Sequence, residues 1–491
     1  MKRLSIYLLT ISALSLFSGC EALLEEPVKS EYTESTLLSS KSGLESLLAD
    51  AYSRGNDIRN IVKRSDMTTD ILTQSGGGEN GNCVPLINFR WDPSNTLEAF
   101  SWMQYWEMVR NANIVLDNIP NASGFTNEDE KVYMEAEARF LRIDAYYYLW
   151  DQYGPMPIRR SVDDPLELSR ASDEEFSEFM ETELIDIINN IYPADSEPAY
   201  GRANKGAALG FLCLWYLNTH QWQKCLDTAQ EIIDGKAGKM YELFSDYNML
   251  FALENERNNE FIWTMTCLAN SGSTNILLAT DLPLGFKEGI DGYLEGVVNT
   301  KWSNFASNYR LYDDFYYSFD ENDLRKGRIV TKYKDSNGKT VDLLDASHKD
   351  DTRAIKFPPD PAASGNAHGN DFPLIRYAEI LLAKAEALLE LKGVNQTSID
   401  LVNQIRNRAG LSNFSLSDFS TKEALLEQIL NERKWEFWHE GKRRRDLIRT
   451  NKYIQCAHDR GIPNAKESHV WFPIKQSAID ANPLLKQNDG Y

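Results

Sequence analysis

The residue types that carry metal, redox and nucleophilic chemistry are scarce in this sequence. Six cysteines and six histidines are spread over 491 residues, and no Cys-X-X-Cys pair occurs. Such sparse cysteine excludes a disulfide scaffold, and without that pair we expect no structural zinc site. No Gly-X-Ser-X-Gly motif is present, and His439-Glu440 lacks the second histidine of a metalloprotease motif. The 73 acidic residues still leave open a glycosidase, which needs only two carboxylates about 5–10 Å apart.

Positive charge and long apolar runs are also in short supply. Lysine and arginine number 52 against 73 acidic residues, so the formal net charge is −21. Because that charge repels a phosphate backbone, we expect no nucleic-acid partner, whereas a neutral ligand such as a sugar remains open. The longest apolar run, residues 4–17, has about 14 residues and is shorter than the roughly 20 that span a bilayer. We therefore expect the mature protein to be soluble apart from any anchor.

The N-terminus has the three parts of a secretory signal. Lys2 and Arg3 precede the apolar run, and Ser18-Gly19-Cys20 follows it. A charged start, a short apolar core and small residues before the cleavage point are typical of such signals. The Ser-Gly-Cys ending resembles the bacterial lipobox, in which the cysteine is lipidated and becomes the first residue. We expect residues 1–19 to be removed and Cys20 to carry a lipid; the alternative is an ordinary cleaved signal.

Residues 20–42 are expected to form a lipidated tether and N-terminal segment. Its first part, residues 21–26, has the acidic sequence EALLEE. This stretch loosely resembles the acidic tracts that send lipoproteins of Bacteroidota to the cell surface. The alternative is that these acids only keep a tether solvated. The resemblance favours an outer-membrane protein that is exposed at the cell surface.

Helical periodicity is the dominant signal after this segment, because apolar side chains recur at i, i+3, i+4 and i+7. A short apolar stretch at residues 261–265 predicts a buried strand. The sequence therefore predicts a mainly α protein. The expected helices lie at roughly 43–54, 97–119, 128–152, 173–191, 203–219, 223–235, 373–392, 396–409, 421–441 and 443–450.

Two pairs of the predicted helices resemble repeat units. In residues 205–235, Cys213 and Cys225 occupy the small-residue positions of a tetratricopeptide-like hairpin, and residues 373–409 form a similar pair. A disulfide between these cysteines is one hypothesis for an exported chain. The alternative that we favour is two buried thiols that pack as small hydrophobic groups. A repeat scaffold that binds only proteins is a further function class.

Two stretches, residues 75–96 and 268–372, have few helical runs. Turn signals are frequent in them, including Gly76-Gly77-Gly78, Asn337-Gly338 and Pro358-Pro359. Long loop-rich blocks within a helical protein are more often functional than idle. We predict that they hold functional residues and are carried by a helical core at roughly 43–265 and 373–491.

Several blocks of the sequence resemble motifs of the SusD/RagB-like family. The clearest are RYAEILLAKAEA at residues 376–387 and NQIRNRAG at residues 403–410. The chain ends on QNDGY, in which Asp489 replaces the usual proline of the family. The blocks follow the family's order over essentially the whole chain. They lie at residues 137–157, 376–387, 403–410, 432–447 and 471–491.

The resemblance implies a single domain over residues 43–491, with tetratricopeptide-like hairpins and an irregular, loop-rich ligand face. Members of the family are outer-membrane lipoproteins of Bacteroidota that bind glycans at the cell surface. They form a lid on a SusC-like TonB-dependent transporter and are not enzymes. Because some relatives carry peptides or glycopeptides, a non-glycan nutrient remains an alternative ligand, and the sequence does not specify which glycan.

The charged residues of these motifs have a simpler structural explanation than ligand binding. Arg376, Glu379 and Glu386 fall within one predicted helix, and Arg406 and Arg408 fall within the next. Opposite charges on facing helices form charge-assisted hydrogen bonds that fix their packing. We expect that role for all five.

Sugar recognition requires flat apolar rings beside fixed polar groups. Of the eleven tryptophans, Trp91 and Trp302 lie in the loop-rich stretches, whereas the others fall on predicted helices, the strand or the C-terminal motif. We predict that these two rings contact the ligand; the alternative is that each packs its loop onto the helical body. In the family, loops at these places contribute to the glycan site. The accompanying candidates are Asn88, Arg90, Asp70, Tyr293, Tyr309 and Asp281.

Acidic side chains are also frequent between Asp313 and Asp323. Carboxylate oxygens suit calcium, although the spacing is not that of an EF-hand. A structural calcium is therefore a minor alternative to a solvated acidic turn. We otherwise expect no cofactor and no metal site.

Overall fold

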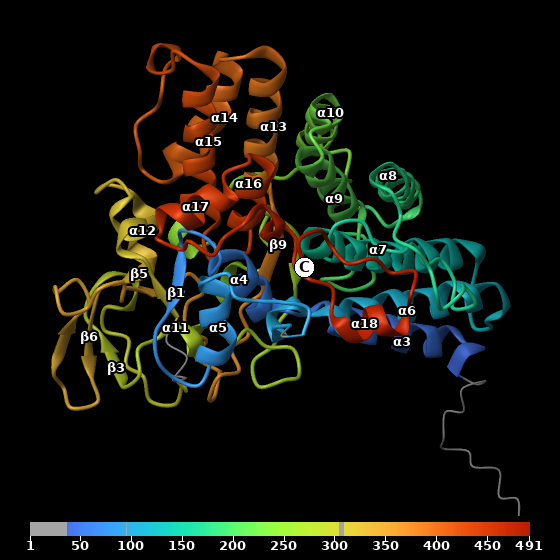
Figure 1. Cartoon of the computed structure of the whole chain (residues 1–491), viewed down its shortest axis with the longest axis horizontal. Coiled ribbons are helices and arrows are strands. Elements are labelled where there is room, and N and C mark those ends of the chain that lie inside the picture. The colour runs from blue at the N-terminus through green and yellow to red at the C-terminus, as the bar shows by residue number, and fades with distance from the viewer. Residues whose placement is uncertain (1–36, 95, 304–308) are drawn as a thin grey trace, which may run out of the picture.

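The computed structural model describes residues 37–94, 96–303 and 309–491, so Cys20 and the acidic stretch after it lie outside the described residues. Helices packed side by side form most of the molecule, and a smaller part with short strands lies at one end (Figure 1). No helix of the described residues has both the length and the apolar character needed to cross a membrane. The main helices are α3 (Lys41–Gly55), α6 (Trp102–Asn118), α7 (Glu128–Tyr153), α8 (Asp173–Asn190), α9 (Lys205–Asn218), α10 (Trp222–Ile233), α13 (Tyr377–Lys392), α14 (Gln396–Arg408) and α15 (Lys422–Phe437).

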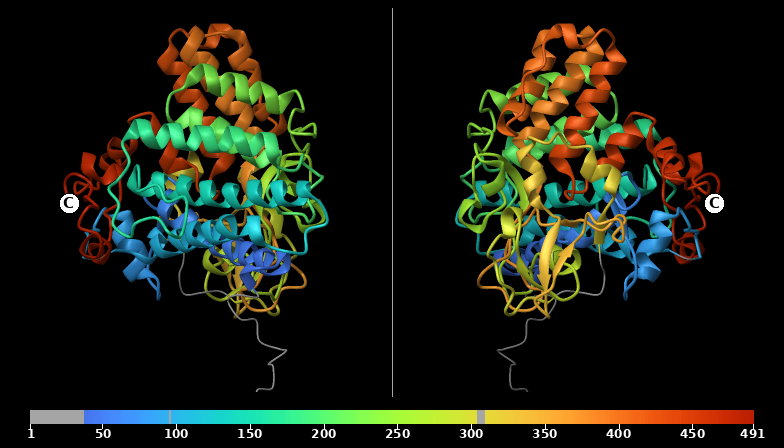
Figure 2. Two further views of the ribbon diagram at one scale, coloured as in Figure 1. Left: turned by 90° about the vertical axis from the view of Figure 1, so that its right-hand side faces the viewer. Right: turned by 90° about the vertical axis from the view of Figure 1, so that its left-hand side faces the viewer.

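These helices form a continuous stack in which each packs on its neighbour. Helix α3 packs on α6, α6 on α7, α7 on α8, α8 on α9, and α9 on α10. Helix α10 in turn packs on α13, which contacts α14 and α15. Figure 2 shows the stack rising from the blue α3 to the orange α13–α15. The mainly α, tetratricopeptide-like architecture that the periodicity and the resemblance predict is confirmed.

Local capping groups set the ends of several helices. Asn127 accepts a hydrogen bond from the Glu130 amide at the start of α7, and Gly154, with φ 77°, ends this helix before Pro155. Ser172 and Glu175 form a reciprocal capping box at the start of α8. Such caps satisfy amides that have no partner within the helix. They explain why the predicted boundaries of these helices agree closely with the structure.

Three predicted helices are shorter than expected. Helix α6 begins at Trp102 rather than near 97, because Ser101, with φ 47°, separates it from a short 3-10 turn at Glu98–Phe100. Strand β9 (Phe372–Arg376) pairs antiparallel with β2 (Phe261–Met265), so α13 begins only at Tyr377 and the predicted strand at 261–265 is confirmed. Helix α15 ends at Phe437 rather than near 441. There the carbonyls of Glu436 and Trp438 accept hydrogen bonds from Lys356 Nζ, at 2.8 and 2.7 Å. A buried tertiary partner thus competes with the next helical turn.

The smaller part is built from short elements that join distant segments. Its strand pairs in the described residues are antiparallel, and β1–β4 pairs Leu72, which lies just before the first loop-rich stretch, with Leu311 of the second. The elements are α4 (Ile58–Asp66), β1 (Leu72–Gln74), α5 (Asn80–Ile87), α11 (Leu277–Asp281), β3 (Phe286–Gly289), β4 (Tyr309–Leu311), α12 (Asp313–Tyr317), β5 (Ile329–Val330), β6 (Lys332–Asp335), β7 (Thr340–Asp342) and β8 (Arg353–Ala354).

The glycine-rich stretch at 75–96 is not entirely loop. Helix α5 forms within it and buries Cys83, Leu86 and Ile87, which are spaced i, i+3 and i+4. This short apolar stripe favours a helix even though Pro85 lies inside it. The loop-rich part also has a small hydrophobic cluster of its own: Leu278, Leu282, Phe286, Leu294, Val330, Tyr333, Leu343 and Ile355.

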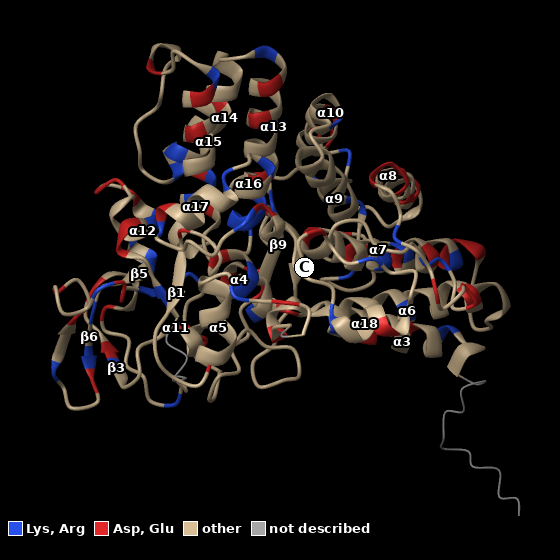
Figure 3. Cartoon of the chain, in the orientation of Figure 1, with Lys and Arg blue, Asp and Glu red and all other residues tan. Residues whose placement is uncertain are grey.

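The charged motif residues form a buried ion network, as expected. The Arg376 guanidinium binds Glu436 at 2.9 Å and Glu440 at 2.8 Å, and Arg408 binds Glu260 at 2.6 Å. Figure 3 shows acidic and basic residues intermixed on α13–α16 (α16 is Arg443–Arg449). The partners of the other motif residues are Arg433 and Lys442 for Glu379, Arg449 for Glu386 and Glu432 for Arg406. These residues fix the packing of the C-terminal helices.

Cys213 and Cys225 are free thiols in the structure. Both are fully buried, and their sulfur atoms lie 4.0 Å apart. A disulfide requires about 2.05 Å between the sulfurs. The prediction of two buried thiols between α9 and α10 is therefore confirmed, and the disulfide hypothesis is wrong for this structure.

Candidate functional site

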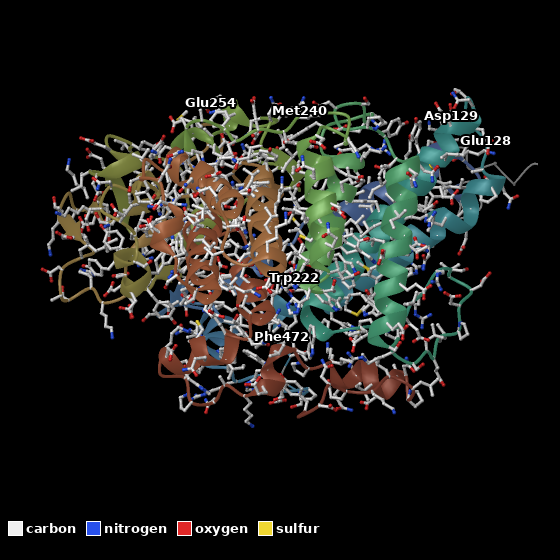
Figure 4. All side chains as sticks on the ribbon, turned by 90° about the horizontal axis from the view of Figure 1, so that it is seen from above. Glu128, Asp129, Trp222, Met240, Glu254 and Phe472 are labelled. Carbon is white, nitrogen blue, oxygen red and sulfur yellow. The ribbon has the colours of Figure 1, made fainter. Side chains whose placement is uncertain are left out.

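Trp91 packs its loop onto the C-terminal segment. The ring is 4% exposed, and its Nε1–H donates to the Tyr491 hydroxyl at 2.8 Å. Edge-on contact with Phe472, at 5.3 Å between ring centroids, holds it further. Figure 4 places Phe472 across the molecule from Met240 and Glu254, on the side of the C-terminal segment. Neither face of the Trp91 ring is free. The ring therefore packs its loop onto the body of the protein, and the prediction that it contacts the ligand is corrected.

Asn88 and Arg90 lie beside this buried ring at the surface. Asn88 is half-buried and donates to the Val84 carbonyl at the end of α5, whereas Arg90 is exposed. Phe89 between them has φ 53°, a left-handed conformation that turns the chain sharply. Their contact with a ligand stays a prediction.

Asp70, Asp281 and Tyr309 have interior partners or positions. Arg443 binds both carboxylate oxygens of Asp70, at 2.8 and 3.0 Å. Although burial opposes it, this pairing holds the pKa of Asp70 well below its ordinary value. Asp281 is 2% exposed and lies 2.8 Å from His439 Nε2, and Tyr309 is fully buried in β4. Asp281 and Tyr309 are therefore not available to a ligand at the surface, whereas the Asp70 side chain is 27% exposed but is already bound by Arg443, and its contact with a ligand stays a prediction.

Tyr293 is half-buried and stacks on Arg328. The centre of the guanidinium lies 3.4 Å from the ring centroid, so one face of the ring is occupied by a cation. Tyr293 therefore offers a ligand only its edge and its other face, and its contact with a ligand stays a prediction.

Trp302, the second tryptophan predicted to contact the ligand, reaches the surface of the loop-rich part. It is half-buried, and a backbone bridge pairs it with Gly365. Asn299 Oδ1 accepts from the Trp302 amide at 2.9 Å, and the Ser303 amide donates to the Gly365 carbonyl at 2.7 Å. Both hydrogen bonds fix the backbone that carries the ring.

The surroundings of this ring form what we call the Trp302 patch: Asn270, Lys301, Trp302, Gly365 and Asn366. Asn270 joins the loops, because its side chain donates to the Ala362 carbonyl and accepts from the Ser364 amide, both at 2.9 Å. Lys301 is exposed, and Asn366 is partly exposed. Gly365 has φ 67°, a conformation that favours glycine. The patch combines an aromatic ring with amide and ammonium groups on hydrogen-bonded loops.

His368 supports the patch from beneath. Its ring centroid lies 6.0 Å from that of Trp302, and it is almost fully buried. Burial lowers the pKa of His368 to about 4, so this imidazole is neutral at physiological pH. The patch therefore rests on an uncharged side chain, and its properties do not depend on a histidine charge near pH 7.

The two predicted tryptophans do not share one surface among the described residues. Trp91 contacts the C-terminal segment, whereas Trp302 contacts the loop at residues 360–368. The acidic residues between Asp313 and Asp323 are the candidates for calcium binding. Of these, Asp323 is already paired with Arg325 at 2.7 Å. No group of three or more potential ligands in the described residues is arranged to hold a metal. The calcium alternative has no support in this geometry.

A cavity of about 560 Å³ lies beside α3 and β2, and sequence analysis missed it. Its lining comes from α3, α6, α7, β2, β9 and the segments at 200–202 and 266–273. No local pattern reveals such a site, since each segment contributes only one face. The buried polar side chains of the lining are Asp144 and Thr264, and Trp263 adds a buried aromatic ring.

Known proteins resemble this chain along most of its sequence. Residues 355–491 match the pattern described as "SusD family", and residues 23–217 match that described as "Starch-binding associating with outer membrane". The chain belongs to the SusD/RagB-like family. It is 23% identical to "SusD-like protein P25" of Formosa agariphila, over 100% of this chain and 99% of that one. It is 24% identical to "Starch-binding protein SusD" of Bacteroides thetaiotaomicron, over 84% of this chain and 82% of that one.

Solved structures of the family share the fold. A "Laminarin binding SusD-like protein" superposes with a TM-score of 0.75 at 21% identity, covering 92% of this chain and all of that one. A SusD homolog from Bacteroides thetaiotaomicron superposes with a TM-score of 0.77 at 20% identity, covering 94% and 99%. At such identities the likeness extends to the architecture and not to the residues of a ligand site.

Proposed function

We propose that this protein is a cell-surface lipoprotein that binds an oligosaccharide or polysaccharide and delivers it to a SusC-like TonB-dependent outer-membrane transporter. The observation that carries the proposal is the Trp302 patch, a ring at the surface between hydrogen-bonded loops. Family membership supports it, together with relatives whose names specify starch or laminarin. The anchor would be a lipid on Cys20, and the role is binding without catalysis.

The patch suits a sugar for physical reasons. The C–H face of a pyranose packs on an aromatic ring, while its hydroxyls bond to amide and ammonium groups. In the patch these polar groups are supplied by Asn366 and Lys301. Because the loops are held by backbone and side-chain hydrogen bonds, little ordering is needed on binding, which favours affinity.

The experiment is a binding panel of polysaccharides with the soluble protein, residues 21–491. Trp302→Ala is expected to weaken binding of the recognised polymer about 30-fold, which corresponds to about 2 kcal/mol for a central aromatic anchor. Tyr317→Ala is the matched control, because Tyr317 is 61% exposed on α12 and does not belong to the patch. Equal affinity of native protein and Trp302→Ala would exclude the patch as the site.

Delivery requires a second experiment. Lipidated full-length protein should co-purify with its transporter from outer membranes, and Cys20→Ala should lose membrane attachment. Binding of a peptide rather than any polysaccharide would replace the glycan by a peptide ligand in the same role. Release of reducing sugar by the purified protein would contradict the non-catalytic proposal.

A further inference from the structure

The cavity beside α3 and β2 is built like a small-molecule site. Its volume of about 560 Å³ falls within the range of about 300–1,000 Å³ that ligand pockets occupy. The floor is apolar and buried: Leu48, Met108, Leu141 and Leu374. The lining residues Ala49, Ser53 and Gly272 are exposed, so the cavity opens to solvent on their side.

Asp144 lines this cavity with no partner for its carboxyl group. The side chain is 5% exposed, and no hydrogen bond or ion pair to it is made by the described residues. Most buried carboxylates among the described residues have an arginine or lysine beside them, as Asp446 does. A buried polar group without a partner destabilises a protein by about 1–3 kcal/mol, so its presence at a cavity calls for an explanation.

Trp263 contributes an aromatic ring to the wall of the same cavity. The ring is 5% exposed on β2, and its Nε1–H has no acceptor among the described residues. This N–H is enclosed by the protein and does not reach the cavity, so the unused polar group of the cavity is the Asp144 carboxyl. A ligand that satisfies a carboxyl group must carry a hydrogen-bonding group, as a hydroxylated molecule does.

Three other polar side chains of the wall are already paired. Arg202 Nε binds Glu137 at 2.7 Å, and the hydroxyl of Tyr52 accepts from the Ala203 amide at 2.8 Å. The hydroxyl of Tyr200 donates to Asp371 at 2.7 Å. These bonds neutralise the charge of Arg202 and fix the aromatic rings. The cavity thus offers rigid ring surfaces without a free cation among the described residues of its wall, which disfavours an anionic ligand.

The cavity is separate from the Trp302 patch, although one loop contributes to both. Asn270 belongs to the patch, whereas Gly272 and Ser273 line the cavity. The Ser273 hydroxyl accepts from Asn56 Nδ2 at 2.6 Å and so closes this loop against the end of α3. Trp302 itself is not part of the lining.

We propose that this cavity is a second binding site, which takes a neutral, hydroxyl-bearing ring of the size of a monosaccharide or disaccharide. One ligand hydroxyl bonds to the Asp144 carboxyl, and the apolar floor and the Trp263 ring receive the C–H face. The site rests on the proposed glycan function and extends it from a surface polymer to a small sugar, but its contacts do not involve the Trp302 patch.

Calorimetric titration of the soluble protein tests this proposal with glucose, galactose, maltose, cellobiose, lactose and laminaribiose as probes. At least one is expected to bind saturably with a Kd of about 1 mM or tighter. Asp144→Leu should weaken that binding about tenfold or more, because it removes the carboxyl group to which the ligand hydroxyl bonds. Asp144→Asn keeps one acceptor oxygen and should give an intermediate affinity.

Two controls separate the cavity from the patch. Trp302→Ala should leave the small-sugar affinity unchanged while it weakens polymer binding, and the melting temperature of each variant shows whether it is folded. If small sugars lose affinity in Trp302→Ala and keep it in the cavity variants, they bind at the patch and the proposal is overturned. Absence of saturable binding by all six probes also overturns it, whereas the proposed function is then tested by the polymer panel alone.

Discussion

Asp144→Asn is expected to remove a pH-dependent loss of stability. Burial without a compensating charge raises the pKa of Asp144 from 3.8 to about 8. Between those values the folded state keeps the proton and the unfolded state releases it, so stability falls as pH rises. The slope is about 1.4 kcal/mol per pH unit, which amounts to about 5 kcal/mol from pH 4 to pH 8. Asparagine does not titrate, so the variant lacks this loss.

The assay is thermal unfolding of native protein and Asp144→Asn at a series of pH values from 4 to 9. Burial also raises the pKa of Asp66 to about 6 and that of Glu256 to about 7, but both groups titrate in the two proteins alike. The difference between the melting temperatures therefore isolates Asp144. The melting temperature of the variant minus that of native protein should increase by roughly 5–10 °C between pH 4 and pH 8 and then stay constant. This range follows from about 1–2 °C per kcal/mol for a chain of this size.

Asp400→Asn is the matched control, because Asp400 is an exposed carboxylate on α14. Its melting-temperature difference from native protein should stay nearly flat over the same pH range. If the difference for Asp144→Asn is equally flat, the carboxyl is solvated or paired in solution. The reasoning that leads from its burial to a ligand-binding cavity would then be refuted.

Three further predictions concern the parts that hold the fold together. Trp91→Ala should lower the free energy of unfolding by about 3–5 kcal/mol, because it leaves a large void, yet polymer affinity at the patch should not change; loss of affinity without loss of stability would contradict the packing role. Arg376→Met should lower the free energy of unfolding, measured in urea, by about 3–5 kcal/mol, because Glu436 and Glu440 lose a buried partner. An unchanged free energy of unfolding would contradict the packing role of Arg376. Thiol titration of the denatured protein without Cys20 should count five free thiols, and a count of three would indicate a Cys213–Cys225 disulfide.

Much of the candidate site was beyond the reach of sequence reasoning. Trp91 and Trp302 both lie in loop-rich sequence, and only tertiary contacts distinguish them. Trp91 is buried by Tyr491, which lies 400 positions later in the chain. Asp70 and Asp281 are likewise matched to Arg443 and His439, which belong to the C-terminal motif block. A loop position predicts neither exposure nor a partner.

The family resemblance and the helical periodicity predicted the architecture because both depend on local information. A helix such as α7 is defined by the spacing of its apolar residues, by the cap at Asn127 and by the stop at Gly154. Where local information competes with a buried partner, the prediction fails. The end of α15 illustrates this, because Lys356 bonds to carbonyls that a longer helix would use.

The sequence by itself thus determined the mainly α class, the positions of most helices and the family. Only the tertiary structure decided which loop ring reaches the surface, how the buried charges pair and where a cavity remains. The physical reason is that burial and pairing depend on segments brought together from across the chain. Asp144 shows this clearly: its helix is predicted from its neighbours in sequence, whereas its isolation beside Trp263 is set by the packing of α7 against β2 and α3.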